Sequence, residues 1–192
     1  TVSRFVRKLY MITRPAAQQR GGMRKLRFSA RNLVLIGAVA SVFAVYFVPM
    51  IIPFQPPDFA LADLDGNVHR LSDHRGKVVL LDFMATWCAA CRVQMALLKN
   101  LWEKYGGSLV LISISVDPAF DTPDVLRAFA ESYQADWIWL SDTAGVQRMF
   151  RVMEIPYTVV IDRQGWVKAR HQGPVDEDVL SREIEEAMSQ GR

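Results

Sequence analysis

The only two cysteines of the 192-residue chain lie three positions apart, in the segment Trp87-Cys88-Ala-Ala-Cys91. An apolar run, Val78–Leu81, precedes them and a stretch with helical spacing follows. A strand therefore brings Cys88 to the first turn of a helix, where unpaired N–H groups and the helix dipole stabilise a thiolate. Cys91 lies one turn further on, within reach of a mixed disulfide on Cys88. The pattern predicts a redox pair with Cys88 as exposed nucleophile and Cys91 as buried resolving thiol.

Two other uses of a Cys-x-x-Cys pair fit the sequence less well. A structural zinc ion needs four ligands, and the three scattered histidines His69, His74 and His171 supply no second pair. A purely structural disulfide across so few residues would close a small loop and remove little chain entropy. We therefore expect no metal and no cofactor other than the Cys88–Cys91 disulfide itself.

Charge is distributed unevenly along the chain. Residues 1–32 carry nine of the 23 Lys and Arg side chains and no Asp or Glu, which leaves 14 basic against 20 acidic residues in the remainder. The overall basic charge thus belongs to the N-terminal tail. Nucleic-acid binding by the remainder is not expected.

Residues 33–54 carry no charge and as a helix would extend about 33 Å, enough to cross the core of a bilayer. A cleaved signal peptide is the alternative, since Ala38-Val-Ala40 fits a small-x-small cleavage site. That site comes early in the apolar run, and large apolar side chains continue beyond it. The sequence therefore favours an uncleaved transmembrane anchor.

The anchor divides the chain into four parts: a basic tail at 1–32, the anchor at 33–54, a linker at 55–58 and one domain at 59–192. The excess of Lys and Arg before the anchor places the tail in the cytoplasm and the domain outside the plasma membrane. Residues 1–22 precede Met23, which could itself be a start, so the origin of this first segment stays open.

Hydrophobic periodicity and turn residues predict the elements of the domain. They are a hairpin from 59–64 and 68–71, a buried strand at 77–84, a helix at 88–105, a buried strand at 108–116, a helix capped by Thr122 and running to Tyr133, a hairpin from 158–162 and 166–171, and a helix at 176–188.

This order, with Cys-x-x-Cys at the first strand-to-helix junction of the domain, resembles the thioredoxin fold. Several segments are more narrowly similar to the membrane-anchored, extracytoplasmic thioredoxin-like proteins of the TlpA/ResA type: Pro57-Asp58-Phe59, Leu71–Val79, Trp87–Cys91, Ile155–Thr158 and Val160–Asp162. The resemblance implies an α/β thioredoxin fold, with a central mixed sheet flanked by helices and an added N-terminal β-hairpin. It also implies site roles for Trp87 and for a cis-proline, Pro156, which would face the disulfide while Ile155 presents its backbone to the substrate.

Two positions depart from the TlpA/ResA pattern, because Gln94 replaces an acidic residue and Ala96 a proline. Asp82, six residues before Cys88, matches instead the buried aspartate of cytoplasmic-type thioredoxins. Burial should raise the pKa of this carboxyl, so that it accepts a proton as Cys91 becomes a thiolate. The alternative is an aspartate at a strand edge, paired with Lys77 or Arg92.

The resemblance implies exchange of disulfides with extracytoplasmic protein cysteines, for example those of cytochrome c or of copper sites. The Ala89-Ala90 dipeptide leaves the direction of electron flow open, although an isolated pair fits a reductase better than an oxidase. We expect a monomer that a membrane electron donor of the CcdA/DsbD type could re-reduce.

Two other classes stay open. One is a Sco-like copper-delivery protein with His171 as a late ligand. The other is a peroxiredoxin-like peroxidase, in whose signature a hydroxyl residue would stand where this chain has Ala85.

Overall fold

The computed structural model describes residues 35, 37–39, 41 and 55–189, and the chain divides into two units at residues 50 and 51. In the predicted anchor, residues 35, 37–39 and 41 are helical. The rest of the anchor and the basic tail lie outside the described residues. Within the described part of the chain, no helix is both long and apolar enough to span a bilayer.

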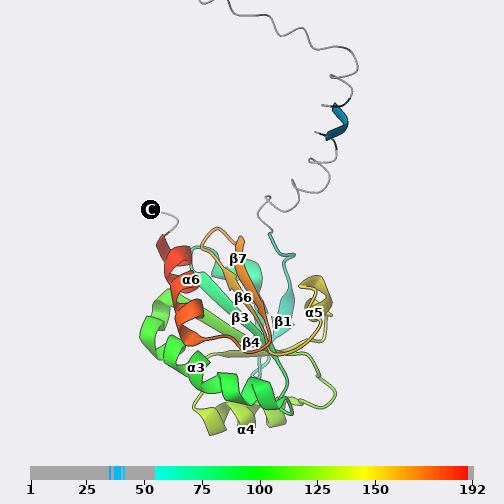
Figure 1. The fold of residues 1–192 in the computed structure, drawn as a ribbon. Coiled ribbons are helices and arrows are strands. Elements are labelled where there is room, and N and C mark those ends of the chain that lie inside the picture. The colour runs from blue at the N-terminus through cyan, green and yellow to red at the C-terminus, as the bar shows by residue number, and fades with distance from the viewer. Residues whose placement is uncertain (1–34, 36, 40, 42–54, 190–192) are drawn as a thin grey trace, which may run out of the picture. The chain divides into compact units, whose positions relative to one another are not determined.

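A five-stranded mixed sheet in the order β5-β4-β3-β6-β7 forms the centre of the second unit (Figure 1). β3, β4 and β5 are parallel, whereas β6 runs antiparallel to β3 and β7 antiparallel to β6. Every residue of the central strand β3 is buried, which explains its nearly continuous apolar run. The strands are β3 (Val78–Met84), β4 (Leu109–Ser115), β5 (Ile138–Ser141), β6 (Tyr157–Ile161) and β7 (Val167–Gln172).

Helices and loops cover both faces of the sheet. On one face, α3, α4 and α6 close a core that contains Leu80, Leu98 and Ile184. On the other face, α5 and the N-terminal hairpin cover a second core, with Phe83 and Phe150 at its centre. The remaining elements are β1 (Ala60–Ala62), β2 (Val68–Arg70), η1 (Leu71–His74), α3 (Ala89–Tyr105), η2 (Gly106–Ser108), α4 (Pro123–Tyr133), α5 (Val146–Met149) and α6 (Glu177–Ser189).

This architecture confirms the predicted thioredoxin-like fold, a mixed sheet with flanking helices. The N-terminal hairpin forms as expected, but its strands are only three residues long. The sequence prediction missed β5 and α5, because four residues are too few to establish a period of two or of 3.6.

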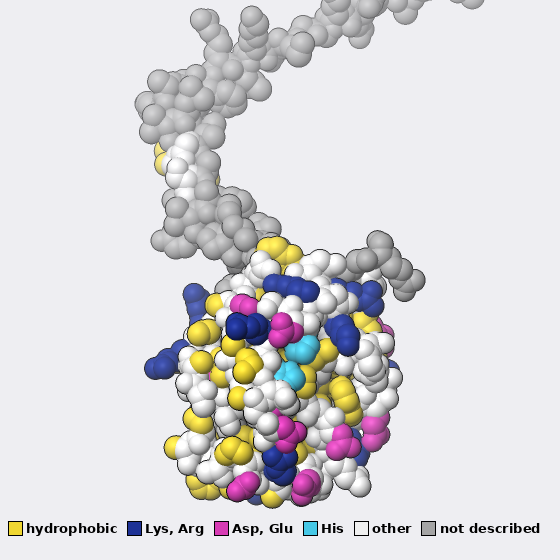
Figure 2. All heavy atoms as spheres, turned by 180° about the vertical axis from the view of Figure 1, so that it is seen from behind, with side chains coloured by type: hydrophobic (Ala, Val, Ile, Leu, Met, Phe, Trp, Pro, Cys, Tyr) yellow, Lys and Arg dark blue, Asp and Glu magenta, His cyan; other side chains and the backbone are white. Residues whose placement is uncertain are grey.

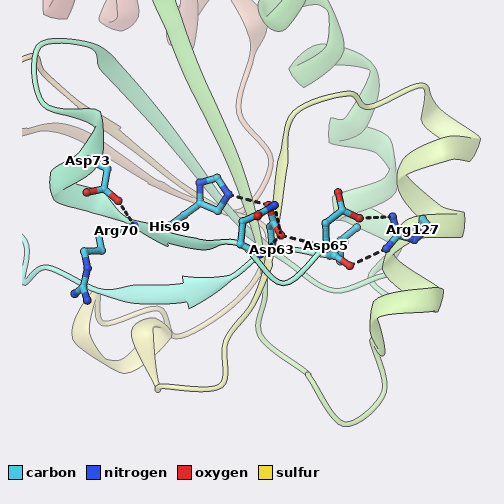
Figure 3. Close-up of polar contacts among 8 residues, drawn as sticks. Asp63, Asp65, His69, Arg70, Asp73 and Arg127 are labelled. Carbon is cyan, nitrogen blue, oxygen red and sulfur yellow. Dashed lines mark hydrogen bonds and ion pairs between the residues drawn. The ribbon is translucent and has the colours of Figure 1, made fainter.

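Polar contacts hold the N-terminal hairpin together and join it to α4 (Figure 3). Within the hairpin, His69 Nε2 lies 2.9 Å from Asp63 Oδ2. From α4, Arg127 donates to Asp65 Oδ1 at 3.1 Å and to the Leu64 carbonyl at 2.7 Å. A single β-bridge also joins Asp63 to Leu140 of β5. The hairpin therefore lies beside the β5 edge of the sheet.

Two histidine side chains lie together on the face in Figure 2, where basic and acidic side chains are interspersed. The rings of His69 and His74 stack with their centroids 6.1 Å apart. Partial burial, together with the neighbouring His69, lowers the pKa of His74. The ring of His74 is therefore expected to be largely neutral at pH 7.

Candidate active site

The end of β3 and the start of α3 position the two cysteines. Cys88 is the N-cap of α3, and its Sγ accepts a hydrogen bond from the Cys91 backbone N–H at 3.1 Å. The two residues form a disulfide with their Cα atoms 5.2 Å apart. In the reduced protein, the same N–H group would stabilise a thiolate on Cys88. The predicted division of roles between the two cysteines depends on this contact.

Both cysteines are buried in the oxidised protein, with 6% of Cys88 and 2% of Cys91 exposed. The expectation of an exposed Cys88 is therefore wrong in degree, although Cys88 is the more accessible of the two. The loop that carries Ile155 lies against the disulfide, and the Ile155 carbonyl oxygen is 3.9 Å from Cys88 Sγ. Sequence spacing could not predict this contact, because the two residues are 67 positions apart.

The peptide bond between Ile155 and Pro156 is cis, the geometry that the resemblance implies. Pro156 is buried, and its carbonyl accepts a hydrogen bond from the Gly173 N–H at 2.8 Å. The backbone of Ile155 is thereby held next to the disulfide. Trp87 directly precedes Cys88 in the sequence, and 51% of its surface is exposed.

Asp82 lies on β3 with 2% of its surface exposed. Burial is the largest influence and raises the pKa of this carboxyl to about 7, while a hydrogen bond from the Ser113 hydroxyl opposes the rise. The Ser113 Oγ donates to Asp82 Oδ2 at 3.1 Å. Burial and the Ser113 hydroxyl are the described influences on Asp82 and no cation is among them, so the alternative pairing with Lys77 or Arg92 is not supported.

Sequence reasoning missed a second buried carboxylate, Asp121, in the loop between β4 and α4. It accepts hydrogen bonds from the backbone N–H of Thr86 at 3.0 Å, from the Thr86 hydroxyl, and from Ser115 Oγ at 2.6 Å. In the same loop, Asp117 Oδ2 accepts a hydrogen bond from Trp87 Nε1 at 3.1 Å. The carboxyl ends of parallel strands lie at one edge of a sheet, so acidic residues just after β4 could have indicated this link to the loop after β3.

Two buried polar side chains near the site have no hydrogen-bond partner among the described residues. They are Gln94, on the first turns of α3, and Thr158, which lies opposite Asp82 on β6. Gln94 stands where the TlpA/ResA pattern has an acidic residue. Its burial, with 3% exposed, shows that this position faces the protein interior.

The described residues contain no group of three or more His, Cys, Asp or Glu side chains arranged to hold a metal ion. The candidate copper ligand His171 instead pairs with Glu183 of α6, at 2.7 Å between Nε2 and Oε2. His69 is likewise paired with Asp63. His69 and His171 are thus each paired with a carboxylate and not with the cysteines.

A disulfide at the start of a helix, following the central strand of a mixed sheet and facing a cis-proline loop, defines a thioredoxin-like thiol–disulfide oxidoreductase. Comparison with known proteins agrees with this class. The chain belongs to the AhpC/TSA family, whose sequence profile matches residues 54–170.

Relatives with curated names share about a third of their residues with this chain. It is 32% identical to the thioredoxin-like protein YneN of Bacillus subtilis (strain 168) in an alignment of 131 residues. This alignment covers 68% of this chain and 77% of YneN. It is 31% identical over 176 residues to the thiol-disulfide oxidoreductase ResA of Geobacillus kaustophilus, covering 88% of this chain and 96% of ResA.

Solved structures show the same fold. A candidate thiol:disulfide interchange protein DsbE from Chlorobium tepidum superposes with a TM-score of 0.64 at 30% identity, over 71% of this chain and 96% of that one. The pneumococcal exposed lipoprotein thioredoxin from Streptococcus pneumoniae superposes with a TM-score of 0.56 at 26% identity, over 68% and 99% of the two chains. The protein is a thiol–disulfide oxidoreductase whose redox centre is the Cys88–Cys91 disulfide.

Proposed function

We propose that the protein is a membrane-tethered reductase of disulfides in extracytoplasmic proteins. The observation that carries this proposal is the Cys88–Cys91 disulfide at the N-terminus of α3, with the Cys91 N–H directed at the Cys88 sulfur. This arrangement favours a nucleophilic Cys88 in the reduced state. It also leaves Cys91 one helical turn away as the resolving thiol.

The reaction proceeds in two exchanges. The Cys88 thiolate attacks one sulfur of the substrate disulfide, which forms a mixed disulfide and releases the other substrate sulfur as a thiolate that takes up a proton. Cys91 then loses its proton and attacks Cys88 Sγ, which releases the second substrate sulfur in the same way. Two electrons pass from the cysteine pair to the substrate, and the Cys88–Cys91 disulfide is restored.

Asp82 accepts the proton of Cys91 in the second exchange. Its burial and the rise of its pKa to about 7 support this role, because a general base works best when its pKa lies near the working pH. The Ser113 hydroxyl donates to the Asp82 carboxylate, and no charged partner among the described residues keeps this carboxyl ionised.

The substrate lies across Trp87, Cys88 and the loop before Pro156. The exposed ring of Trp87 supplies apolar area, and the Ile155 carbonyl lies 3.9 Å from Cys88 Sγ. An extended segment of the substrate can hydrogen-bond to that backbone while its cysteine reaches Cys88. Protein thiols and disulfides are therefore the substrate class.

Residues 33–54 anchor the domain at 59–192 to the plasma membrane through the linker at 55–58, with residues 1–32 in the cytoplasm. The alignment with ResA supports this, because it leaves out only about an eighth of the chain and so must extend into the predicted anchor. A membrane electron donor of the CcdA/DsbD type would return electrons to the oxidised pair, and the protein would act as a monomer.

The test follows the redox state of the full chain in cells. Thiols are trapped by acid quenching and alkylated, and the mass of the protein reports whether Cys88 and Cys91 are reduced. A reductase should be mostly reduced at steady state. A pair that is mostly oxidised, and that transfers its disulfide to a reduced protein in vitro, would contradict the proposal.

A pair of variants tests the division of labour. Cys91→Ser should accumulate a mixed disulfide with client proteins through Cys88, because the resolving thiol is missing. Cys88→Ser is the matched control and should trap little. Stoichiometric copper binding by the reduced wild-type protein that both substitutions abolish, without trapping by either variant, would favour the copper-delivery alternative.

A further inference from the structure

We propose that Trp137 and Ser113 form a hydrogen-bond chain of fixed direction that holds a donor on Asp82, so that Asp82 can take the proton of Cys91 at neutral pH. This inference rests on the proposed role of Asp82. It assigns a positioning function to two residues that touch neither cysteine in the reaction.

The direction of the chain follows from the chemistry of its members. The indole Nε1 of Trp137 can only donate, and it lies 2.9 Å from Ser113 Oγ. The Ser113 hydroxyl has one hydrogen and lies 3.1 Å from Asp82 Oδ2. Because Trp137 occupies an acceptor position on this oxygen, the Ser113 hydrogen is directed at Asp82. A donor that faces a carboxylate favours its ionised form.

Burial strengthens the effect of the Ser113 hydrogen bond on the ionisation of Asp82. Ser113 is fully buried, Asp82 is 2% exposed and Trp137 is 7% exposed, so bulk water has little access to the contact. In such surroundings a hydrogen bond to a charged group is stronger than in water. The chain therefore counteracts the burial that would otherwise keep Asp82 protonated.

Among the described groups around Asp82, the hydroxyl of Ser113 is the side-chain donor that hydrogen-bonds to its carboxylate. On the β6 side, Thr158 lies directly opposite Asp82, with a hydroxyl that has no partner among the described residues. From α3 the inward titratable group is Cys91, held in the disulfide. From α6 the buried residues are Leu180, Ser181, Ile184 and Ala187.

The nearest titratable pair in the same row of the sheet is one strand further out. His171 of β7 lies opposite Thr158 and pairs with Glu183 of α6 at 2.7 Å. No charged partner is among the causes of the pKa shift of Asp82, which are burial and Ser113 alone. A change at Ser113 should therefore act on Asp82 without competition from an ion pair.

Trp139 of β5 provides a matched control for Trp137. Trp139 is also buried, and its ring stacks on that of Trp137 with centroids 5.8 Å apart. Trp139 lies opposite Ser113 in the register of β4 and β5, but its indole Nε1 donates to the Ala135 carbonyl at 2.9 Å rather than to the Ser113 hydroxyl. Trp139→Phe thus removes a buried indole N–H as Trp137→Phe does, but leaves the chain to Asp82 intact.

The experiment measures two quantities on the oxidised and reduced full-length protein. The infrared C=O band of a protonated carboxyl, identified by its loss in Asp82→Asn, is followed against pH to give the protonation midpoint of Asp82. Single-turnover attack of Cys91 on a mixed disulfide at Cys88 is followed by tryptophan fluorescence over the same pH range. The first readout does not depend on any catalytic role for Asp82.

Ser113→Ala should raise the midpoint by about one pH unit and slow Cys91 attack at pH 7 by about five- to tenfold, with recovery at higher pH. Trp137→Phe should shift both in the same direction by less, since the hydroxyl remains but is no longer oriented. Ser113→Thr restores the hydroxyl and should return the midpoint toward the wild-type value. Trp139→Phe should leave it unchanged.

An unchanged midpoint in Ser113→Ala would overturn the inference, as would equal shifts in Trp137→Phe and Trp139→Phe. If Trp137→Phe fails to fold, the two Ser113 variants decide. A midpoint that shifts while the pH profile of Cys91 attack stays in place would leave the hydrogen-bond chain standing and would overturn the proposed role of Asp82.

Discussion

The backbone N–H of Cys91 donates to Cys88 Sγ across 3.1 Å, so the residue that resolves the mixed disulfide also stabilises the sulfur that forms it. Among the described residues no hydrogen-bond donor acts on Cys91 Sγ, and only 2% of Cys91 is exposed, against 6% of Cys88. The two thiols of the reduced protein should therefore differ in both acidity and access.

Alkylation of the reduced full chain at neutral pH should accordingly modify Cys88 first. The modified residue is identified by peptide mass spectrometry after partial reaction with iodoacetamide. Faster modification of Cys91 would contradict the assignment of Cys88 as nucleophile.

Asp82→Asn should remove a pH dependence of stability. The pKa of Asp82 is about 7 in the folded protein against an ordinary value of 3.8, so the folded state binds the proton more tightly and loses stability as pH rises from about 4 to 7. The loss is on the order of 4 kcal/mol. The variant should gain stability relative to wild type across that range and level off above it, as measured by chemical denaturation at a series of pH values.

The same substitution should slow attack by Cys91 about 10²-fold or more, because it removes the general base. A slower variant that is also less stable than wild type at pH 8 would indicate a structural aspartate. A variant that is as fast as wild type would rule out proton transfer to Asp82.

Asp121→Ala should destabilise the domain by roughly 3 kcal/mol, because it leaves three buried donors on Thr86 and Ser115 without their acceptor. Thr86→Val removes one of the three donors and keeps the backbone contact, so its effect should be smaller. Thermal unfolding followed by circular dichroism measures both. Equal effects of the two substitutions would mean that the Thr86 N–H and the Ser115 hydroxyl contribute little to stability.

Gln94→Met should stabilise the protein by about 1–3 kcal/mol, since it replaces two buried amide atoms that have no partner with an apolar chain of similar length. Cys91 attack should keep its wild-type rate. A marked fall in that rate would show that Gln94 contributes to proton transfer, in the position where the TlpA/ResA pattern carries an acid.

The cysteine pair and the longer strands and helices were predictable because each depends on a local pattern, whereas the four-residue β5 and α5 were missed. Thr122 caps α4 and Gly106 ends α3 with a positive φ of 50°, as the sequence indicates. The contacts of Asp121 with Thr86 and of Trp137 with Ser113 join residues 35 and 24 positions apart. Such contacts depend on the order of strands in the sheet, which no single segment encodes. The burial of Cys88 was also missed, although the resemblance had placed the loop of Ile155 and Pro156 opposite the disulfide, where the Ile155 carbonyl lies 3.9 Å from Cys88 Sγ.

The fastening of the N-terminal hairpin has a consequence for self-association. A sheet edge with unpaired N–H and C=O groups is a template for pairing with another chain, and β5 would present one. The hairpin, held by Arg127 on Asp65 and by the bridge from Asp63 to Leu140, occupies part of that edge. At the opposite edge, β7 carries Lys168 and Arg170, and basic side chains discourage edge-to-edge pairing. Both edges of the sheet are thus protected against fibre-like aggregation.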